Sequence, residues 1–378
     1  MARIRLGMVG GGNDAFIGGV HRIAARIDDR FELVAGALSS TPEKSAASAA
    51  ALGIARSYGS FAEMAEAEAA RDDGIEAVSI VTPNHVHFAA AEAFLAKGIH
   101  VICDKPLTAT MEDAAKMEKA VASSDALFVL THNYTGYPMI RQARAMVQAG
   151  ELGDIRVVQA EYPQDWLATP MENEGLKQAE WRTDPSRSGA GGSVGDIGTH
   201  AHNLACFVTG LTVESLAADL QAFGAGRTLD DNAHMMLRFG GGARGMLWSS
   251  QVAPGNENGL KLRIYGTKGG IEWLQADPNY LWFTPLGQSK RLITRGGAEA
   301  NDAANAVSRI PGGHPEGYLE GFATIYNEAA DAIRAVQSGT SREDAMGVLP
   351  GIVEGMSGMA FINACVTSSS KDAAWVTL

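Results

Sequence analysis

The sequence is poor in cysteine and has neither a basic run nor a long apolar run. Its three cysteines, Cys103, Cys206 and Cys365, are widely separated and form no C-x-x-C pair, which argues against a disulfide framework or a zinc ribbon and favours a reducing compartment. The formal charge of −12 comes from scattered acids, so nothing resembles a patch that neutralises nucleic-acid phosphates. The apolar run near the N-terminus ends in glycines and is too short for a signal sequence or a membrane span. We therefore expect a cytoplasmic protein that binds neither nucleic acid nor a membrane.

Length and periodicity indicate two domains. A chain of 378 residues exceeds what one hydrophobic core usually supports, and 46% hydrophobic residues is ordinary for a globular protein. The segments "IRLGMVGGG", "GGVHRIAARI" and "FELVAGALSS" form a βαβ unit, and the strands "EAVSIVTP", "HVICDKP" and "LFVLTHNY" follow with helices between them. This alternation predicts an α/β domain with a parallel, doubly wound sheet over residues 1–132.

From residue 133 the pattern changes to longer alternating segments, such as "IRVVQAEYPQDW" and "GLKLRIYGTKGGIEWL". Alternation joined by glycine-rich turns favours an antiparallel sheet with one solvated or partner-covered face. We therefore predict an α+β domain over residues 133–378, closed by two amphipathic helices that either stay in this domain or pack back on the first. The irregular stretch over 285–315 is open to interpretation as a lid or as an oligomer arm.

Glycines mark a candidate phosphate loop after the first strand. Gly10, Gly11 and Gly12 end the strand and Gly18 begins the helix, where backbone can approach a pyrophosphate, although five residues separate the last two glycines. No acid ends the second strand, so NAD and NADP both stay open, and a ligand-free turn with serine caps is the alternative. The cofactor contacts predicted here are Gly10, Gly12, Asn13, Phe16, Ile17, Ser39, Ser40 and Lys44.

Two further strand ends lie on the same rim. In a doubly wound sheet, ligands bind at the carboxyl ends of the strands, where "TPNH" and "DKP" stand. A lysine placed there would meet the cofactor. The predicted cofactor contacts from these turns are Thr82, Pro83, Asn84, His87, Asp104 and Lys105, although His87 also suits simple packing at a helix start.

The second domain offers "SGAGGSVGDIGTHAHN". If its helix begins near Asp196, then Asp196, His200 and Asn203 fall on one face, at positions i, i+4 and i+7, while His202 points elsewhere. A carboxylate, an imidazole and an amide on one face suit a polyhydroxylated ligand, because two of them can hold hydroxyls while the histidine moves a proton.

The motifs "TPNHVH", "DKPL" and "GGSVGDIGTH", with "RIYGTKGGIEW" downstream, resemble the Gfo/Idh/MocA family of sugar and inositol dehydrogenases over nearly the whole chain. The resemblance implies an N-terminal Rossmann dinucleotide-binding domain and a C-terminal α+β domain whose open, mainly antiparallel sheet forms a homo-dimer or homo-tetramer. It also implies oxidation of a carbinol, with the hydride passing to a nicotinamide.

Motif matching assigns the catalytic roles. Lys105 matches the lysine of the family's E-K-P motif, and Asp196 and His200 match its aspartate and catalytic histidine. Our hypothesis is that His200 takes the hydroxyl proton, Lys105 polarises the same oxygen and Asp196 orients His200 or the substrate. Asp104 stands in place of the usual glutamate and Asn203 where many relatives have aspartate, which places the substrate outside those of the best-known members.

The remaining candidate substrate contacts each have a structural alternative. Tyr134 at the domain junction and Trp166 beside Asp165 suit a sugar platform, and equally suit packing or a sheet-mediated interface. His314 precedes a long helix and either reaches the active site or caps that helix. Neither His85-x-His87 nor His200-x-His202 has the further ligands that a metal needs, so no metal is expected.

The predicted activity is thus an NAD(P)-dependent oxidation of a secondary ring hydroxyl in a cyclic polyol: an inositol, a pyranose or a glycoside. One alternative is a redox-neutral enzyme that oxidises a sugar transiently in order to cleave a glycosidic bond. The other is a non-catalytic sugar or cofactor sensor, which would have no need of Lys105, Asp196 and His200 together.

Overall fold

The computed structural model describes residues 2–13, 15–175 and 177–378. The chain forms two compact units, each built from two segments. The first unit contains Met1–Asn133 and Leu319–Ser357, and the second contains Tyr134–Tyr318 and Gly358–Leu378.

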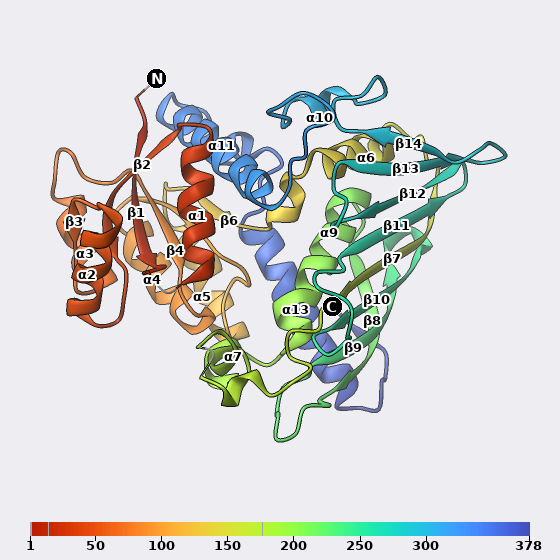
Figure 1. Cartoon of the computed structure of the whole chain (residues 1–378), viewed down its shortest axis with the longest axis horizontal. Helices are drawn as coiled ribbons and strands as arrows, with labels where there is room; N and C mark the ends of the chain where they lie inside the picture. Colours follow the sequence, from red (N-terminus) through yellow and green to blue (C-terminus); the bar gives the residue numbers. More distant parts are fainter. Residues whose placement is uncertain (1, 14, 176) are drawn as a thin grey trace. The chain divides into compact units, whose positions relative to one another are not determined.

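A six-stranded sheet forms the centre of the first unit, in the order β3-β2-β1-β4-β5-β6 with every pair parallel (Figure 1). The strands are β1 (Ile4–Gly10), β2 (Phe31–Ala37), β3 (Arg56–Ser57), β4 (Ala77–Val81), β5 (His100–Cys103) and β6 (Phe128–Leu130). Every residue of β4 and β5 is buried, as expected of parallel strands covered on both faces. The predicted doubly wound sheet is confirmed, and its order reverses between β1 and β4, the usual place for a ligand.

Helices connect these strands. They are α1 (Phe16–Ile27), α2 (Pro42–Leu52), α3 (Phe61–Ala69), α4 (His87–Leu95) and α5 (Met111–Ala122), followed after residue 317 by α11 (Tyr318–Gln337) and α12 (Arg342–Met346). Helix α11 lies beside α1, because the His21 ring of α1 bonds to the Tyr326 hydroxyl of α11 (Figure 1). A sequence-distant segment therefore completes the first unit.

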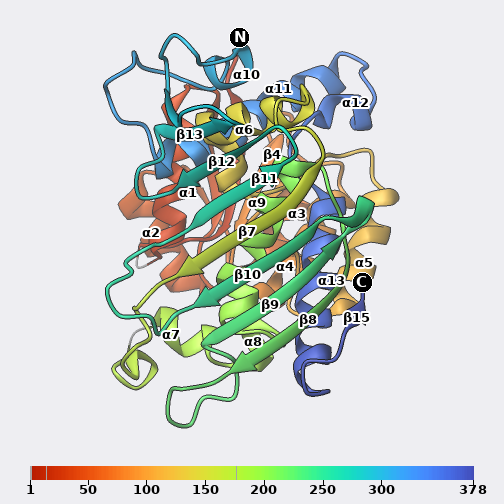
Figure 2. The same ribbon diagram turned by 90° about the vertical axis from the view of Figure 1, so that its right-hand side faces the viewer.

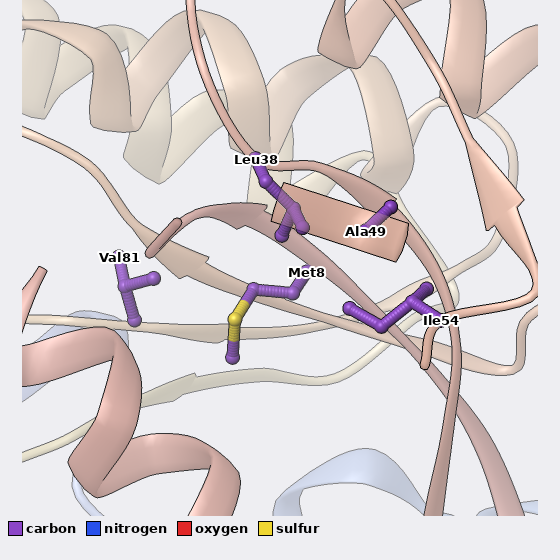
Figure 3. Packing of buried hydrophobic residues seen from close by; sticks show 5 residues of the cluster. All are labelled: Met8, Leu38, Ala49, Ile54 and Val81. Carbon is purple, nitrogen blue, oxygen red and sulfur yellow. The ribbon is translucent and has the colours of Figure 1, made fainter. Parts of the chain in front are cut away.

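A small apolar cluster packs next to the glycine turn. Met8 of β1 packs with Leu38, Ala49, Ile54 and Val81, which come from the end of β2, from α2 and its following turn, and from β4 (Figure 3). Truncating such a side chain typically costs about 2–5 kcal/mol. The cluster therefore holds β1, β2 and β4 in register where the strand order reverses.

The second unit is built on a nine-stranded sheet in the order β14-β13-β12-β11-β7-β10-β9-β8-β15 (Figure 2). Its strands are β7 (Ile155–Pro163), β8 (Val213–Gln221), β9 (Asn232–Phe239), β10 (Arg244–Ser250), β11 (Lys261–Gly266), β12 (Gly269–Leu274), β13 (Tyr280–Pro285), β14 (Arg291–Thr294) and β15 (Val376–Thr377). All pairs are antiparallel except β7 with β10. The predicted, mainly antiparallel sheet is therefore confirmed.

Helices cover one face of this sheet, its inner face, and leave the opposite, outer face uncovered among the described residues. Further helices lie in the connections between strands. They are α6 (Pro138–Gln148), α7 (Lys177–Arg182), α8 (Pro185–Ser188), α9 (Thr199–Thr209), α10 (Asp302–Asn305) and the later part of α13 (Ile352–Ser369). Within the segment 285–315, residues 291–294 form strand β14 at the sheet edge and so belong to the sheet. Buried Leu281 and Phe283 alternate with exposed Tyr280 and Trp282 in β13, a strand signal that the sequence analysis missed.

The helix expected to begin near Asp196 begins earlier, with a π-helical turn over Val194–Gly198 that leads into α9. The buried Asp230 carboxylate explains this start, because it accepts the backbone N–H groups of Gly192 at 2.7 Å and of Val194 at 2.8 Å. Those donors would otherwise be unsatisfied at a helix N-terminus.

Candidate active site

The glycine turn after β1 can accept only glycine at its closest approach. A Cβ atom on Gly18 would lie 2.4 Å from the Cα of Gly11, and Gly10 and Gly11 have φ values of +76° and +70°. Helix α1 begins at Phe16 without a side-chain hydrogen bond to its first turn. Its first N–H groups and its dipole can therefore receive an anion such as a pyrophosphate.

The other predicted cofactor contacts near this turn surround the ends of β1 and β2. The Asn13 amide lies 3.5 Å from Ser48 Oγ, and Phe16 is 67% exposed. Ser39 accepts the Thr41 amide at 3.3 Å, whereas Ile17 is half-buried and both Ser40 and Lys44 are exposed. No acid stands at the end of β2, so the structure adds no anchor specific for an unphosphorylated ribose.

His87 joins the two other turns on this rim. Its ring is fully buried, with Nδ1 2.9 Å from the Pro106 carbonyl oxygen and Nε2 3.0 Å from the Thr82 carbonyl oxygen. Burial lowers its pKa, against the opposing charge of Asp104. Both neighbours are carbonyl oxygens and a neutral imidazole has a single N–H, so His87 donates to one of the two carbonyls while its buried ring packs between the turns that carry Asn84 and Lys105.

Asp104 and Lys105 follow β5 directly, and both are partly exposed. Asp104 Oδ1 accepts the Thr131 hydroxyl at 2.9 Å. Burial alone would raise the pKa of this carboxyl, but the neighbouring His21 and Lys105 hold the pKa well below its usual range. The peptide bond between Lys105 and Pro106 is cis. An ionised carboxylate thus stands one residue before the lysine.

In the second unit the His200 ring lies against a pair of tyrosines, Tyr134 and Tyr162. The His200 and Tyr134 rings meet edge to face with centroids 5.0 Å apart. Tyr134 donates to Tyr162, because the Tyr162 hydroxyl itself donates to Asn258 at 2.7 Å. Burial raises the pKa of Tyr134, and the Asp196 charge adds to this rise. Tyr134 is thus buried beneath His200 with its hydroxyl engaged.

Two residues that hold Asp196 were not found from the sequence. Gln251 donates to Asp196 Oδ2 at 2.9 Å, and Arg182 Nε lies 3.3 Å from the same oxygen. Gln251 follows β10 and Arg182 ends α7, so neither is close to Asp196 in the chain. No local motif marks such partners. Asp196 is therefore oriented by two donors from different parts of the second unit.

The other predicted substrate residues of the second unit have mixed surroundings. Asn203 is buried in α9, while His202 stacks flat on Phe361 with ring centroids 4.3 Å apart and so faces away from the tyrosine pair. Asp165 accepts the Gly255 amide at 3.0 Å, and the neighbouring Trp166 is half-buried in the turn after β7.

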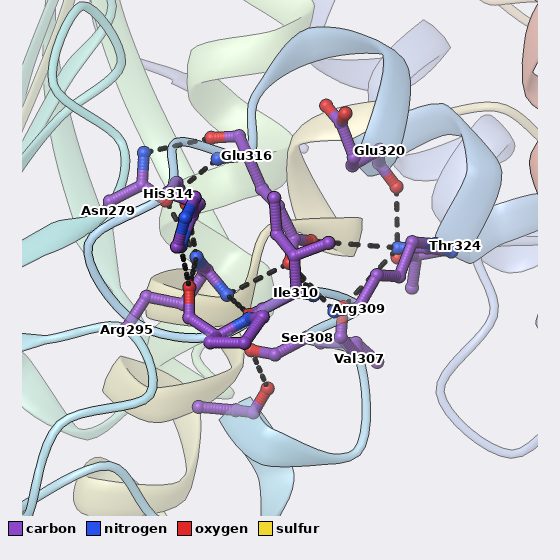
Figure 4. Close-up of polar contacts among 12 residues, drawn as sticks. Asn279, Arg295, Val307, Ser308, Arg309, Ile310, His314, Glu316, Glu320 and Thr324 are labelled. Atoms are coloured by element: carbon purple, nitrogen blue, oxygen red, sulfur yellow. Dashed lines mark hydrogen bonds and ion pairs between the residues drawn. The ribbon is translucent and has the colours of Figure 1, made fainter.

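His314 is exposed in a loop that a buried ion pair holds (Figure 4). Arg295 Nη1 lies 2.9 Å from Glu316 Oε1, and the Arg295 guanidinium also donates to the backbone carbonyls of Ile310 and His314. Glu316 accepts the Arg309 amide at 2.7 Å. The loop backbone at His314 is therefore fixed although its side chain is exposed.

Two kinds of feature are absent from the part of the chain that the structure describes. Across 2–13, 15–175 and 177–378, no cluster of three or more His, Cys, Asp or Glu side chains has the arrangement of a metal site. Within the same ranges, no helix has the length and apolar character that crossing a membrane requires.

A glycine turn at an uncapped helix start, at the reversal point of a parallel sheet, defines a dinucleotide-binding protein. The family models agree: the oxidoreductase family with an NAD-binding Rossmann fold matches residues 4–132, and the GFO/IDH/MocA C-terminal domain matches residues 140–272. The chain belongs to the Gfo/Idh/MocA family of oxidoreductases, whose relatives act on sugar and polyol hydroxyls.

Three relatives are similar over most of their length. An oxidoreductase from Sinorhizobium meliloti has 61% identity, a TM-score of 0.90 and full coverage of both chains. An inositol dehydrogenase homologue from Azotobacter vinelandii, complexed with NAD⁺, has 36% identity, a TM-score of 0.95 and coverage of 100% of this chain and 97% of its own. With NADH and myo-inositol, that homologue gives 35% identity, a TM-score of 0.92 and coverage of 100% and 98%. Levoglucosan dehydrogenase of Pseudarthrobacter phenanthrenivorans is 30% identical over 72% of this chain and 73% of its own.

Proposed function

We propose that the protein is an NAD(P)-dependent dehydrogenase that oxidises a secondary ring hydroxyl of a cyclic polyol. The observation that carries the proposal is the rim of the first unit, where the glycine turn after β1 and Lys105 after β5 share the carboxyl edge of one parallel sheet. A myo-inositol complex of one relative and the levoglucosan of another support a ring-shaped polyol as the substrate class.

Each residue of the proposed site has its own role in the reaction. A bound nicotinamide supplies the hydride acceptor. His200 takes the hydroxyl proton, and Asp196, itself held by Gln251 and Arg182, orients the imidazole or the substrate. Lys105 donates a hydrogen bond to the hydroxyl oxygen and so stabilises the negative charge that develops there. Tyr134 packs against His200 and limits its rotation.

The decisive experiment measures nicotinamide reduction by the purified protein. NAD⁺ and NADP⁺ are supplied separately against a panel of inositols, aldoses and glycosides, with the His200→Ala variant beside the natural protein. Reduction that depends on one polyol class and is lost in the variant supports the proposal and identifies the cofactor. No reduction across the panel, with nicotinamide still bound after purification, would replace it by redox-neutral glycoside cleavage.

We also propose that two or more copies associate through the outer face of the nine-stranded sheet. Large apolar side chains are exposed along seven of its strands: Val157, Met236, Met246, Tyr265, Leu274, Tyr280, Trp282 and Leu292. A row of exposed apolar groups on an open sheet is typical of an interaction surface.

A further inference from the structure

Two fully buried side chains of the first unit have no part in the roles given above. His21 of α1 is 0% exposed and Tyr326 of α11 is 1% exposed. His21 Nδ1 lies 2.9 Å from the Tyr326 hydroxyl, which lies 2.8 Å from the Ser79 hydroxyl of β4. Buried polar groups are costly unless they are satisfied, so this cluster demands a reason.

The other nitrogen of His21 faces Asp104. His21 Nε2 has no hydrogen-bond partner among residues 2–13, 15–175 and 177–378, and it lies 3.8 Å from Asp104 Oδ1. That separation exceeds a hydrogen bond but lies within ion-pair range. Because a carboxylate only accepts, the favourable tautomer carries the proton on Nε2, and Nδ1 then accepts the proton of the Tyr326 hydroxyl.

Ser79 completes the hydrogen-bond order. Ser79 Oγ also lies 3.3 Å from His21 Nδ1, but the Tyr326 hydroxyl is closer at 2.9 Å and is therefore assigned as the donor to that nitrogen; the Ser79 hydroxyl then donates to the Tyr326 oxygen. The chain of donors then runs from Ser79 through Tyr326 and His21 towards Asp104, and each bond polarises the next. Thr131 donates to the same Asp104 oxygen from another side. Oδ1 is thus the oxygen that faces the buried groups.

The carboxylate so directed is adjacent to Lys105. Asp104 has a short side chain, so the groups that face its Oδ1, His21 and Thr131, leave the carboxylate few other orientations. A carboxylate that stays ionised and in place favours the ammonium form of a neighbouring lysine over the amine. The low pKa of Asp104 agrees with such a surrounding.

We propose that His21 and Tyr326 are positioning residues that act on Lys105 through Asp104, by keeping that carboxylate ionised and directed. The inference rests on the proposed function in one respect only, namely that Lys105 contributes to turnover. The step involves no covalent change, since the hydroxyl of Tyr326 fixes the tautomer of His21 and the imidazole N–H attracts the carboxylate.

The first test needs no substrate. The full-length protein is treated with a limiting amount of an amine-reactive acylating reagent, and the rate of Lys105 acylation is measured by peptide mass spectrometry. We expect Lys105 to react about twofold or more faster in Tyr326→Phe and faster again in His21→Leu, because the amine form gains when the carboxylate is released. Equal Lys105 rates in all three proteins would overturn the proposal.

Tyr58→Phe is the matched control. The Tyr58 hydroxyl donates to the buried Glu68 carboxylate at 2.6 Å in the same unit, so Tyr58→Phe also removes a tyrosine hydrogen bond, here to a carboxylate and at a place remote from Lys105 in the chain. The two Tyr→Phe variants should lose similar thermal stability, and only Tyr326→Phe should change the acylation rate of Lys105. If Tyr58→Phe also changed that rate, the cause would be a general loosening of the unit, and the proposed action of His21 and Tyr326 through Asp104 would be refuted.

The second test uses activity once a substrate is known. Tyr326→Phe should lower kcat about threefold to tenfold, the range that one hydrogen bond supplies, with the dissociation constant of the nicotinamide cofactor unchanged. A natural protein without turnover refutes the proposed function and leaves the labelling result standing. If the natural enzyme is active but Tyr326→Phe changes neither kcat nor the labelling rate of Lys105, the positioning role of His21 and Tyr326 is refuted and the proposed function stands.

Discussion

At the residue scale, Lys105 stands partly exposed at the end of β5, with a carboxylate before it and a proline after it. The charge of Lys105 is among the causes that lower the pKa of Asp104, and the buried His87 ring lies between the Thr82 and Pro106 carbonyls. A charge that is held this way needs little rearrangement when a hydroxyl oxygen approaches, which is the condition for effective electrostatic stabilisation. Lys105 should therefore matter for turnover rather than for folding.

Replacing Lys105 by Met should lower kcat by about a hundredfold or more, because a positioned hydrogen-bond donor to a developing negative charge typically supplies that much. Cofactor affinity should stay within about twofold, since the pyrophosphate contacts are at the glycine turn. Titration calorimetry and initial rates measure the two quantities. Lys97→Met, at an exposed ion pair with Glu66, is the control for loss of a lysine. Turnover above a tenth of the natural rate would exclude Lys105 from the chemistry.

A second prediction concerns Ser39, which follows β2 where an acid would select the unphosphorylated ribose. Ser39→Asp should shift the ratio of kcat/KM towards NAD by about tenfold, because a carboxylate accepts the ribose hydroxyls and repels a 2′-phosphate. The exposed Ser123→Asp, at the end of α5, adds the same charge elsewhere in the unit. An equal shift in both variants would mean that net charge, not position, decides.

The sequence could predict the residues that a short motif carries, and not those that the fold alone brings together. "DKP" and "TPNH" mark the rim because they end buried strands. His21 and Tyr326, by contrast, are 305 residues apart, and Asp196 meets Gln251 and Arg182 only in the folded second unit. Such contacts leave no spacing pattern in the chain.

At the scale of elements, local sequence patterns were again predictive, whereas features that depend on contacts distant in sequence could not be predicted. Apolar runs and glycine turns predicted the parallel, doubly wound sheet of the first unit and the mainly antiparallel sheet of the second, but not the order of the strands. The parallel pairing of β7 with β10 and the π-helical start at Val194 could not be predicted, because both depend on contacts between segments distant in sequence. The Asp230 carboxylate that accepts the Val194 amide is an example.

The turn between β1 and α1 gives a sharp element-scale prediction. Gly18→Ala should weaken cofactor binding about tenfold and destabilise the first unit by about 1–3 kcal/mol, because its Cβ meets Gly11 backbone that cannot move cheaply. Gly19→Ala is the matched control in the next position, where the nearest atom to a Cβ is the Arg22 guanidinium at 3.8 Å. Fluorescence titration and thermal melts compare the two. Equal behaviour of both variants would contradict the tight turn.

At the scale of the whole molecule, each unit contains a buried histidine that resists protonation. Burial lowers the pKa of His100 in the first unit and of His202 in the second to about 4, from an ordinary value of 6.5. Between those values the unfolded chain binds protons that the folded chain does not. Stability should therefore fall in both units as the pH decreases from 6.5 to 4.

His202→Asn should remove one group of the second unit that binds a proton in the unfolded chain and not in the folded chain. The slope of the unfolding free energy against pH should then decrease by up to about 1.4 kcal/mol per pH unit between pH 6.5 and 4. Denaturant melts at several pH values, with the two units fitted as separate transitions, measure this slope. An unchanged slope for the second unit would mean that His202 takes up its proton without unfolding.

The outer face of the nine-stranded sheet gives the last prediction, on assembly. Met236 and Met246 stand opposite each other in β9 and β10 and are 55% and 52% exposed. The double variant Met236→Glu/Met246→Lys should keep the fold, since opposite charges pair across strands, yet it should dissociate copies, since an interface would have to desolvate both charges. Val353→Asp, at a 73% exposed residue of α13 outside the sheet, should leave the assembly intact. Light scattering after size exclusion measures the mass of each. An oligomer that survives the double variant would mean that copies meet through another surface.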